Sequence, residues 1–170
     1  MYSFKNFQKK KVKKLSGYLF LKSLLELKIL KYKKFFLINP NINEQKKNYD
    51  LLRTKGIFNQ KSFCAPIYNL SNFKDFKLIK KINLYNPDII IINIGGGIQE
   101  PLGQFVKQNV KKKLTTVICT GAAIGFLTKV QAPINVIYDK FYLGWVIRLI
   151  HNPKSFFPRI IQSFNLIKLF

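Results

Sequence analysis

The most informative part of this chain is the stretch Asp88-Ile89-Ile90-Ile91-Ile92-Asn93-Ile94-Gly95-Gly96-Gly97. Its apolar run is continuous rather than alternating, which is typical of a β-strand covered on both faces, as in a parallel sheet. The glycines end this strand, and Pro101 follows where the first turn of a helix is expected. The stretch therefore predicts a buried parallel strand that leads through a glycine turn into a helix.

Apolar runs and helix-like periodicities alternate on both sides of this stretch. We expect helices at 19–30, 43–55, 73–84 and 101–110, and strands at 35–38, 62–68 and 115–119. Asn43 is the predicted N-cap of the helix that Gly56 ends. This alternation predicts an α/β fold with a Rossmann-like, doubly wound, mostly parallel sheet. We place this core at residues 15–133, between a basic lead-in at 1–14 and a basic amphipathic helical appendage at 134–170.

Length and charge narrow the class of protein. The 170 residues make about one domain, and a hydrophobic share of 48% excludes a disordered chain. With 30 Lys and Arg against 7 Asp and Glu, the formal net charge is +23. Such a charge favours a partner that is negatively charged: nucleic acid, a phosphorylated substrate or an anionic membrane. An AT-rich coding sequence would also enrich lysine, which is the alternative explanation of the charge.

The sequence also argues against several kinds of site. Cys64 and Cys119 are isolated, without a CxxC motif, so a reducing cytoplasm is expected. A single histidine, His151, excludes a His-rich metal site. No stretch reaches the roughly 18 apolar residues of a membrane-spanning helix. The dinucleotide motif GxGxxG is incomplete, because Glu100 stands where the third glycine belongs.

Two predicted strand ends carry candidate ligand-binding residues. In open parallel sheets, ligands bind beyond the carboxyl ends of the strands, where glycines let a ligand approach the backbone. The candidates are Gly95, Gly96, Gly97, Gln99, Glu100, Thr120 and Gly121. Gln99 and Glu100 suit hydrogen bonds with sugar hydroxyls, but Glu100 equally suits a cap of the helix that begins near Pro101. A glycine turn without any ligand is also common after a strand, and both alternatives stay open.

The carboxyl-terminal part of the sequence has a different character. From Lys140 onward there is no acidic residue, and basic residues flank an apolar stripe with helical spacing. The basic residues of interest are Lys140, Arg148, Lys154 and Arg159. Such a stripe is typical of an amphipathic helix at a membrane interface, and equally of a helix that packs on the sheet.

Several motifs, in order and at matching spacing, resemble one family. They are Asn86-Pro87-Asp88, Gln99-Glu100, Thr120-Gly121-Ala122-Ala123, Trp145-Val146-Ile147-Arg148-Leu149 and Asn152-Pro153. Together they resemble the WecG/TagA/CpsF glycosyltransferases (glycosyltransferase family 26), from near Lys14 almost to the end of the chain. The resemblance implies a Rossmann-like core and a carboxyl-terminal appendage that touches the membrane.

The activity that this resemblance implies is an inverting, metal-independent sugar transfer. The donor would be a UDP-sugar of the N-acetylmannosamine type, and the acceptor would be linked to polyprenyl diphosphate. The product would belong to bacterial cell-surface polysaccharide synthesis, made in the cytoplasm at the inner face of the membrane. We expect no cofactor and no metal, since the UDP-sugar is a substrate. A homo-oligomer is left open.

The resemblance also assigns roles to residues. The glycines at 95–97 and the pair Thr120-Gly121 would line the sugar-nucleotide cleft, and Gln99 and Glu100 would contact hydroxyls. Glu100 is the carboxylate at this cleft, so it is the candidate catalytic residue. Arg148 and its basic neighbours would face the acceptor diphosphate and the anionic membrane, because arginine carries a permanent charge and binds phosphate through two hydrogen bonds.

The sequence departs from the family pattern in several places. Family members carry an Asp-Gly motif, with the proposed catalytic aspartate, in an N-terminal part that we expect this chain to lack. Ile124-Gly125, Gln131, Gly144 and Gly97 replace other residues of the family motifs. A non-catalytic remnant or a truncated fragment of such an enzyme is therefore the second hypothesis. The third is a basic nucleic-acid-binding protein, but no RRM, KH, zinc-finger or helix-turn-helix motif is found, so we expect no nucleic-acid partner.

Overall fold

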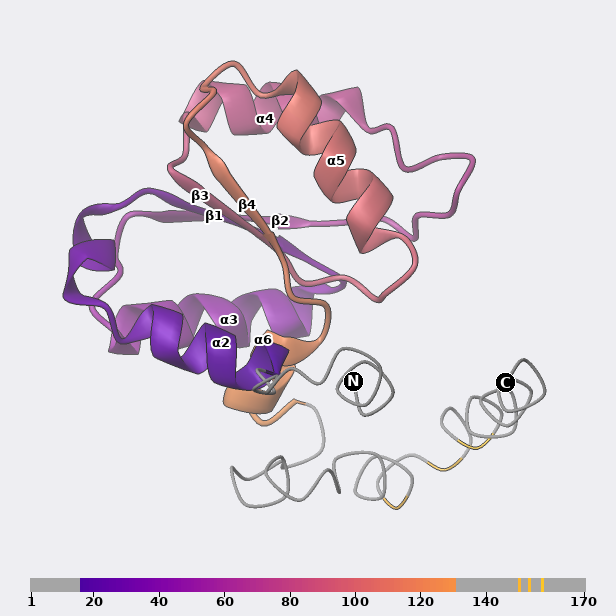
Figure 1. Ribbon diagram of the computed structural model, residues 1–170. Coiled ribbons are helices and arrows are strands. Elements are labelled where there is room, and N and C mark those ends of the chain that lie inside the picture. The colour runs from indigo at the N-terminus through magenta and orange to yellow at the C-terminus, as the bar shows by residue number, and fades with distance from the viewer. Residues whose placement is uncertain (1–15, 131–149, 151–152, 154–156, 158–170) are drawn as a thin grey trace, which may run out of the picture.

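The computed structural model describes residues 16–130, together with Ile150, Pro153 and Phe157. Within this part of the chain, the strands form one parallel sheet in the order β2-β1-β3-β4 (Figure 1). They are β1 (Phe35–Asn39), β2 (Gln60–Cys64), β3 (Ile89–Ile92) and β4 (Thr116–Cys119). The predicted α/β, Rossmann-like fold with a parallel sheet is thereby confirmed.

Helices cover both faces of this sheet, so the fold is doubly wound (Figure 1). One face carries α4 (Phe76–Tyr85) and α5 (Gln99–Asn109). The other carries α2 (Gly17–Leu25), α3 (Ile42–Thr54) and α6 (Ala123–Leu127). A short 3-10 helix, Lys28–Tyr32, connects α2 to β1. No helix in the described part of the chain is long and apolar enough to cross a bilayer.

The core explains why the central strands are apolar without interruption. Along β3, Ile90 and Ile92 pack under α4 and α5, whereas Ile89 and Ile91 pack on the opposite face. All of them are buried, as the continuous run of isoleucines predicts. At the side of the sheet, β4 is only partly covered, because Thr116 and Cys119 remain exposed.

The four predicted helices begin or end at other residues than expected, and two of the differences have a clear local cause. The N-cap of α3 is Asn41, not Asn43: its side-chain oxygen accepts the N–H of Glu44 at 2.8 Å, and its amide donates to the Glu44 carboxylate at 3.1 Å. This reciprocal pair resembles a capping box, although Glu44 accepts from the Asn41 side chain and not from its backbone N–H, and it holds the helix start two residues earlier. The first helix ends at Leu25 rather than 30, because the chain then turns into the 3-10 helix.

The second strand also differs from the prediction of 62–68. It begins at Gln60, whose buried amide donates to the Tyr49 carbonyl of α3 at 2.9 Å. It ends at Cys64, before Pro66, because proline has no N–H to donate to a neighbouring strand. Sequence periodicity missed this strand start, since a buried glutamine resembles a surface residue.

Candidate functional site

The strand order creates a switch point between β1 and β3. From β1 the chain continues to α3 on one face of the sheet, and from β3 it continues to α5 on the other. Neighbouring connections that leave toward opposite faces open a crevice at the edge where the parallel strands end, called here the carboxyl edge. This edge is where the sequence placed the donor-binding residues.

The glycines at 95–97 form an open turn at the carboxyl edge. All three are exposed, and a Cβ added to any of them would meet no atom of the described residues within 4 Å. Only Gly97 has a backbone that favours glycine, with φ at +90°. The turn therefore presents bare backbone to the space outside the sheet, where a ligand can approach it closely.

Gln99 links this turn to the next strand end. Its side chain is 9% exposed, and its oxygen accepts the N–H of Gly121 at 2.5 Å. Its amide donates to the Glu100 carboxylate at 2.7 Å. Gly121 has φ at +56°, and a Cβ there would lie 3.3 Å from the Gln99 amide nitrogen. The structure thus brings the predicted residues Gln99, Glu100 and Gly121 together.

Glu100 does not cap α5 as one alternative predicted, because the helix begins at Gln99 with Ile98 as its N-cap and without a side-chain cap hydrogen bond; its carboxylate instead closes the glycine turn before the helix. Its carboxylate accepts the N–H of Gly97 at 3.2 Å. The hydrogen bond from its own backbone N–H, and then those from Gln99 and Gly97, lower the pKa of Glu100 below its usual value. The side chain is nevertheless exposed and remains accessible to a ligand. Because the carboxylate occupies the start of α5, a pyrophosphate would meet like charge there.

A buried asparagine cluster lies behind this turn, and sequence reasoning missed it. The side-chain oxygen of Asn39 accepts hydrogen bonds from the amides of Asn48, at 2.7 Å, and Asn93, at 3.0 Å. All three side chains are at most 2% exposed. The signal in the sequence is that the apolar runs of β1 and β3 both end in asparagine. Hydrogen-bonded amides of this kind hold the ends of the two strands in register at the switch point.

Thr120, the remaining predicted donor-site residue, lies beside this cluster in the sheet. Its N–H donates to the Ile92 carbonyl at 3.4 Å, so β4 stays beside β3 up to this residue. Within the described part of the chain, its buried hydroxyl and the amide nitrogen of Asn39 have no hydrogen-bond partner. Buried polar groups of this kind are usually satisfied by water or a ligand.

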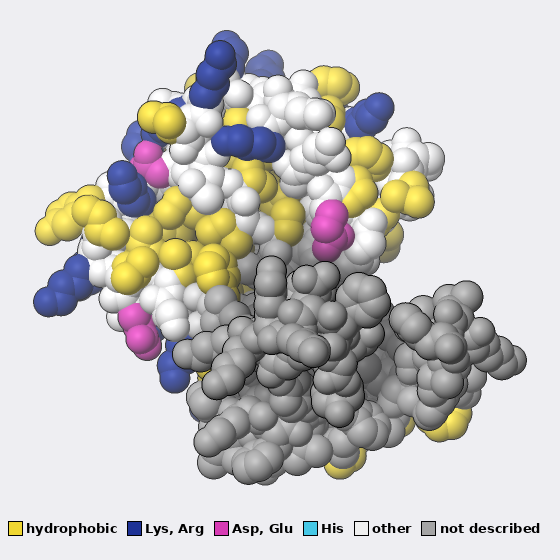
Figure 2. Space-filling model, viewed as in Figure 1, with side chains coloured by type: hydrophobic (Ala, Val, Ile, Leu, Met, Phe, Trp, Pro, Cys, Tyr) yellow, Lys and Arg dark blue, Asp and Glu magenta, His cyan; other side chains and the backbone are white. Residues whose placement is uncertain are grey.

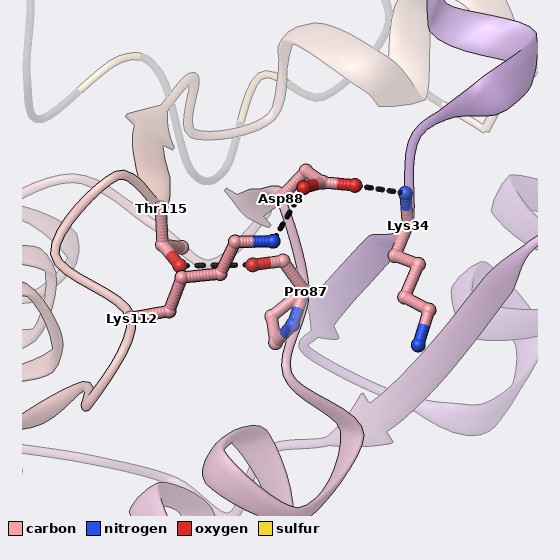
Figure 3. A network of polar contacts seen from close by, with 5 residues as sticks. All are labelled: Lys34, Pro87, Asp88, Lys112 and Thr115. Atoms are coloured by element: carbon pink, nitrogen blue, oxygen red, sulfur yellow. Dashed lines mark hydrogen bonds and ion pairs between the residues drawn. The ribbon is translucent and has the colours of Figure 1, made fainter.

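The Asn86-Pro87-Asp88 motif lies at the opposite end of the strands (Figure 3). Asp88 accepts the N–H of Lys34 at 2.8 Å and the ammonium of Lys112 at 2.5 Å. These bonds, that to Lys112 first, lower the pKa of Asp88. The Thr115 hydroxyl donates to the Pro87 carbonyl at 2.8 Å. This motif therefore joins the starts of β1, β3 and β4 and is structural rather than part of the candidate site.

The predicted acceptor and membrane residues Lys140, Arg148, Lys154 and Arg159 lie outside the described residues. The groups that the described part of the site exposes are the backbone of the glycine turn and one carboxylate, whereas the Gln99 amide is bonded to Gly121 and Glu100 and the Thr120 hydroxyl is buried. Such groups recognise hydroxyls and other neutral polar groups through paired donors and acceptors. This chemistry suits a sugar or a nucleoside.

Comparison with known proteins supports the same chemistry. The model of the "Glycosyl transferase WecG/TagA/CpsF family" matches residues 2–170. No curated protein and no solved structure gives a significant match. The family match spans nearly the whole sequence, including both motifs that meet at the carboxyl edge. The chain thus belongs to the WecG/TagA/CpsF family of glycosyltransferases, a family of cell-surface polysaccharide synthesis.

Proposed function

We propose that this chain transfers a sugar of the N-acetylmannosamine type from a UDP-sugar to an acceptor linked to polyprenyl diphosphate. The observation that carries the proposal is the hydrogen bond from Gly121 to Gln99, which unites two family motifs at one edge of the sheet. In this proposal the sugar and nucleoside of the donor lie over the turn at 95–97, its diphosphate lies away from the Glu100 carboxylate, and Thr120 belongs to the same cleft. The reaction uses no metal and no cofactor.

The proposed reaction is a single displacement with inversion. A hydroxyl oxygen of the acceptor bonds to the anomeric carbon, and the bond from that carbon to the UDP oxygen breaks with its electron pair going to UDP. The hydroxyl proton passes to a base, for which we propose the Glu100 carboxylate. Its lowered pKa keeps it ionised at neutral pH but makes it a weak base, so its contribution should fall at the low end of the roughly 10²- to 10⁴-fold range of general bases.

The acceptor side of the proposal rests on sequence alone. Lys140, Arg148, Lys154 and Arg159 would bind the acceptor diphosphate and an anionic membrane at its cytoplasmic face. Arginine and lysine suit this role because they stabilise phosphate oxygens by charge-assisted hydrogen bonds. Removal of the residues after Pro153 should then weaken the binding of the protein to anionic vesicles.

Calorimetric titration with UDP tests the donor site. The substitution Gly96→Trp should weaken UDP binding by about tenfold or more, a loss of about 1.4 kcal/mol or more, because the indole fills the space over the turn. The fold should tolerate it, since in the part of the chain that the structure describes nothing lies within 4 Å of a Cβ at this position. The matched control is Leu114→Trp, at a residue 89% exposed near the start of β4. Equal UDP affinity of both variants would refute this placement of the donor.

A further inference from the structure

The loop between β2 and α4 presents two bare aliphatic side chains at the carboxyl edge. Ile67 is 95% exposed and Leu70 is 71% exposed. In Figure 1 this loop extends beyond the sheet on the right, on the same side as the loop between β3 and α5 that carries 95–97. Large apolar side chains are rarely this exposed without a binding role when several lie together.

The loop holds these two side chains outward by a defined set of contacts. Tyr68 and Phe73 turn inward and pack against the core under α4 and α5. The Tyr68 hydroxyl donates to the Asp75 carboxylate at 2.7 Å, and the other oxygen of Asp75 caps α4 by accepting the N–H of Leu78 at 2.9 Å. The loop is therefore anchored at both ends on the folded core.

The tip of the loop is closed by its own polar side chains. The Asn72 side chain accepts the N–H of Asn69 at 2.6 Å, and the Asn69 side chain accepts the N–H of Ser71 at 2.9 Å. These Asx-type bonds fix the turn around position 70. The shape of the turn therefore holds Leu70 outward. Because the backbone of the turn is already fixed, binding through Leu70 requires little further loss of backbone entropy.

Basic and apolar residues extend this surface onto the start of α4. Phe76 is 66% exposed, and Lys74 and Lys77 are exposed beside it. Figure 2 shows hydrophobic side chains gathered at this end of the molecule, with a basic side chain nearby. The neighbouring acid, Asp75, is already engaged by Tyr68 and by the helix. The surface made by residues 67–77 is therefore apolar at its tip and cationic at its base.

We propose that this surface of residues 67–77 docks on an anionic lipid bilayer, with Ile67 and Leu70 inserted among the headgroups. Aliphatic tips flanked by lysine suit a lipid interface. Single-stranded nucleic acid is bound by several aromatic platforms in a row, whereas this surface has one exposed aromatic side chain, Phe76. The net charge of +23 complements an anionic leaflet. The inference rests on the proposed function, because it brings the carboxyl edge to the surface where a lipid-linked acceptor lies.

The opposite end of the strands supplies a matched control. Leu84 is 85% exposed and Leu114 is 89% exposed, as bare as the two loop residues. They lie at the end of α4 and just before β4, next to exposed Lys111 and Lys113. A bilayer that meets the carboxyl edge contacts Ile67 and Leu70 but neither of these leucines.

The test compares full-length proteins in sedimentation with vesicles of phosphatidylglycerol and phosphatidylcholine, and with phosphatidylcholine alone. The double variant Ile67→Asp/Leu70→Asp should bind anionic vesicles about tenfold more weakly or worse, since it loses apolar insertion and gains repulsion. Leu84→Asp/Leu114→Asp should keep the parent affinity. Equal binding by parent and loop variant, or release by the control variant instead, would overturn the proposal.

A second measurement reports depth directly. Leu70→Trp in a Trp145→Phe background places the sole tryptophan at the tip of the loop. Brominated lipids should quench the fluorescence of this tryptophan. The fluorescence of Leu84→Trp in the same background should stay unquenched. The reverse pattern would also overturn the proposal. UDP titration of the same proteins in the absence of lipid separates the docking proposal from the proposed function. A loop variant that loses vesicle binding but still binds UDP supports the docking surface and leaves the donor site intact. A parent protein that binds no UDP contradicts the proposed function.

Discussion

Gln99 and Gly121 lie 22 positions apart in the chain, yet the N–H of Gly121 donates to the Gln99 side chain at 2.5 Å. Gln99 is the first residue of α5, next to the loop that follows β3, whereas Gly121 belongs to the loop that follows β4. A buried amide that bridges two loops holds them at one spacing. The shape of the candidate donor site therefore depends on this contact.

Replacement of Gln99 should disturb the site more than the fold. Gln99→Leu removes the acceptor for Gly121 and should lower the free energy of unfolding by about 1 to 2 kcal/mol. It should weaken UDP binding by about tenfold, because both loops lose their fixed spacing. Urea unfolding and calorimetry measure the two effects. The control is Gln104→Leu, at an exposed position of the same helix, and comparable UDP affinity of the two variants would contradict this role.

The close packing of α5 on β4 predicts a coupled pair of substitutions. A Cβ at Gly103 would lie 2.5 Å from the sulfur of Cys119, so Gly103→Ala should destabilise the protein by about 1 to 3 kcal/mol. In the Cys119→Ala background the same change should be neutral or stabilising by up to about 1 kcal/mol, because alanine favours a helix. A double-mutant cycle in urea checks this, and additive effects would disprove the contact.

Asp88 should make stability depend on pH in the acid range. Its pKa is lowered from 3.8, first by Lys112 and then by the backbone of Lys34. The stabilisation is therefore fully present above the ordinary pKa and is lost as pH falls through the lowered one. Asp88→Ala should cost about 1 to 2 kcal/mol at neutral pH, and Asp88→Asn less, because its oxygen still accepts. The control is Asp50→Ala, at an exposed residue. If the free energy of unfolding of Asp88→Ala fell with decreasing pH as steeply as that of the parent protein, the role of Asp88 would be contradicted.

The asparagine cluster predicts that a charge at position 48 is not tolerated. Asn48→Asp puts a carboxylate, at 0% exposure, next to the side-chain oxygen of Asn39, which should cost at least about 3 kcal/mol at neutral pH. Burial raises the pKa of such an aspartate, so the loss should shrink as pH falls. Asn43→Asp in the exposed first turn of α3 should be neutral or stabilising. Equal stability of the two variants in urea would refute the model of the cluster.

Glu100 should influence turnover and its pH dependence. Because its pKa is lowered, the carboxylate stays ionised as pH falls through the ordinary pKa of glutamate, and sugar transfer should lose rate only near the lowered pKa. Glu100→Gln should reduce the rate by about 10²-fold if the carboxylate takes the acceptor proton. Transfer assays from UDP-sugar across this pH range measure both effects. A Glu100→Gln variant with the parent rate would show that another group is the base.

Much of the fold follows from local pattern. The run of isoleucines in β3 and the apolar run of β1 predict buried parallel strands, and the structure confirms both. The start of α3 was missed because Asn41 and Asn43 are both good caps; the spacing from Asn41 to Glu44 was the signal in the sequence that selects Asn41. The bounds of β2 were missed because Gln60 is buried by a contact with Tyr49 of another element.

The candidate site also has features that follow from the sequence and features that depend on tertiary contacts. Sequence alone determined which strand ends carry glycine, amide and carboxylate groups, since strand ends and turns are local features. Only the tertiary structure decided that Gln99 meets Gly121, that Asn39 meets Asn48 and Asn93, and that Asp88 acts at the far end of the strands. These contacts join residues from different elements, and their partners depend on strand order and register. The periodicity of apolar residues indicates which face of a strand or helix a side chain lies on, whereas the packing of strands and helices determines which residues it contacts.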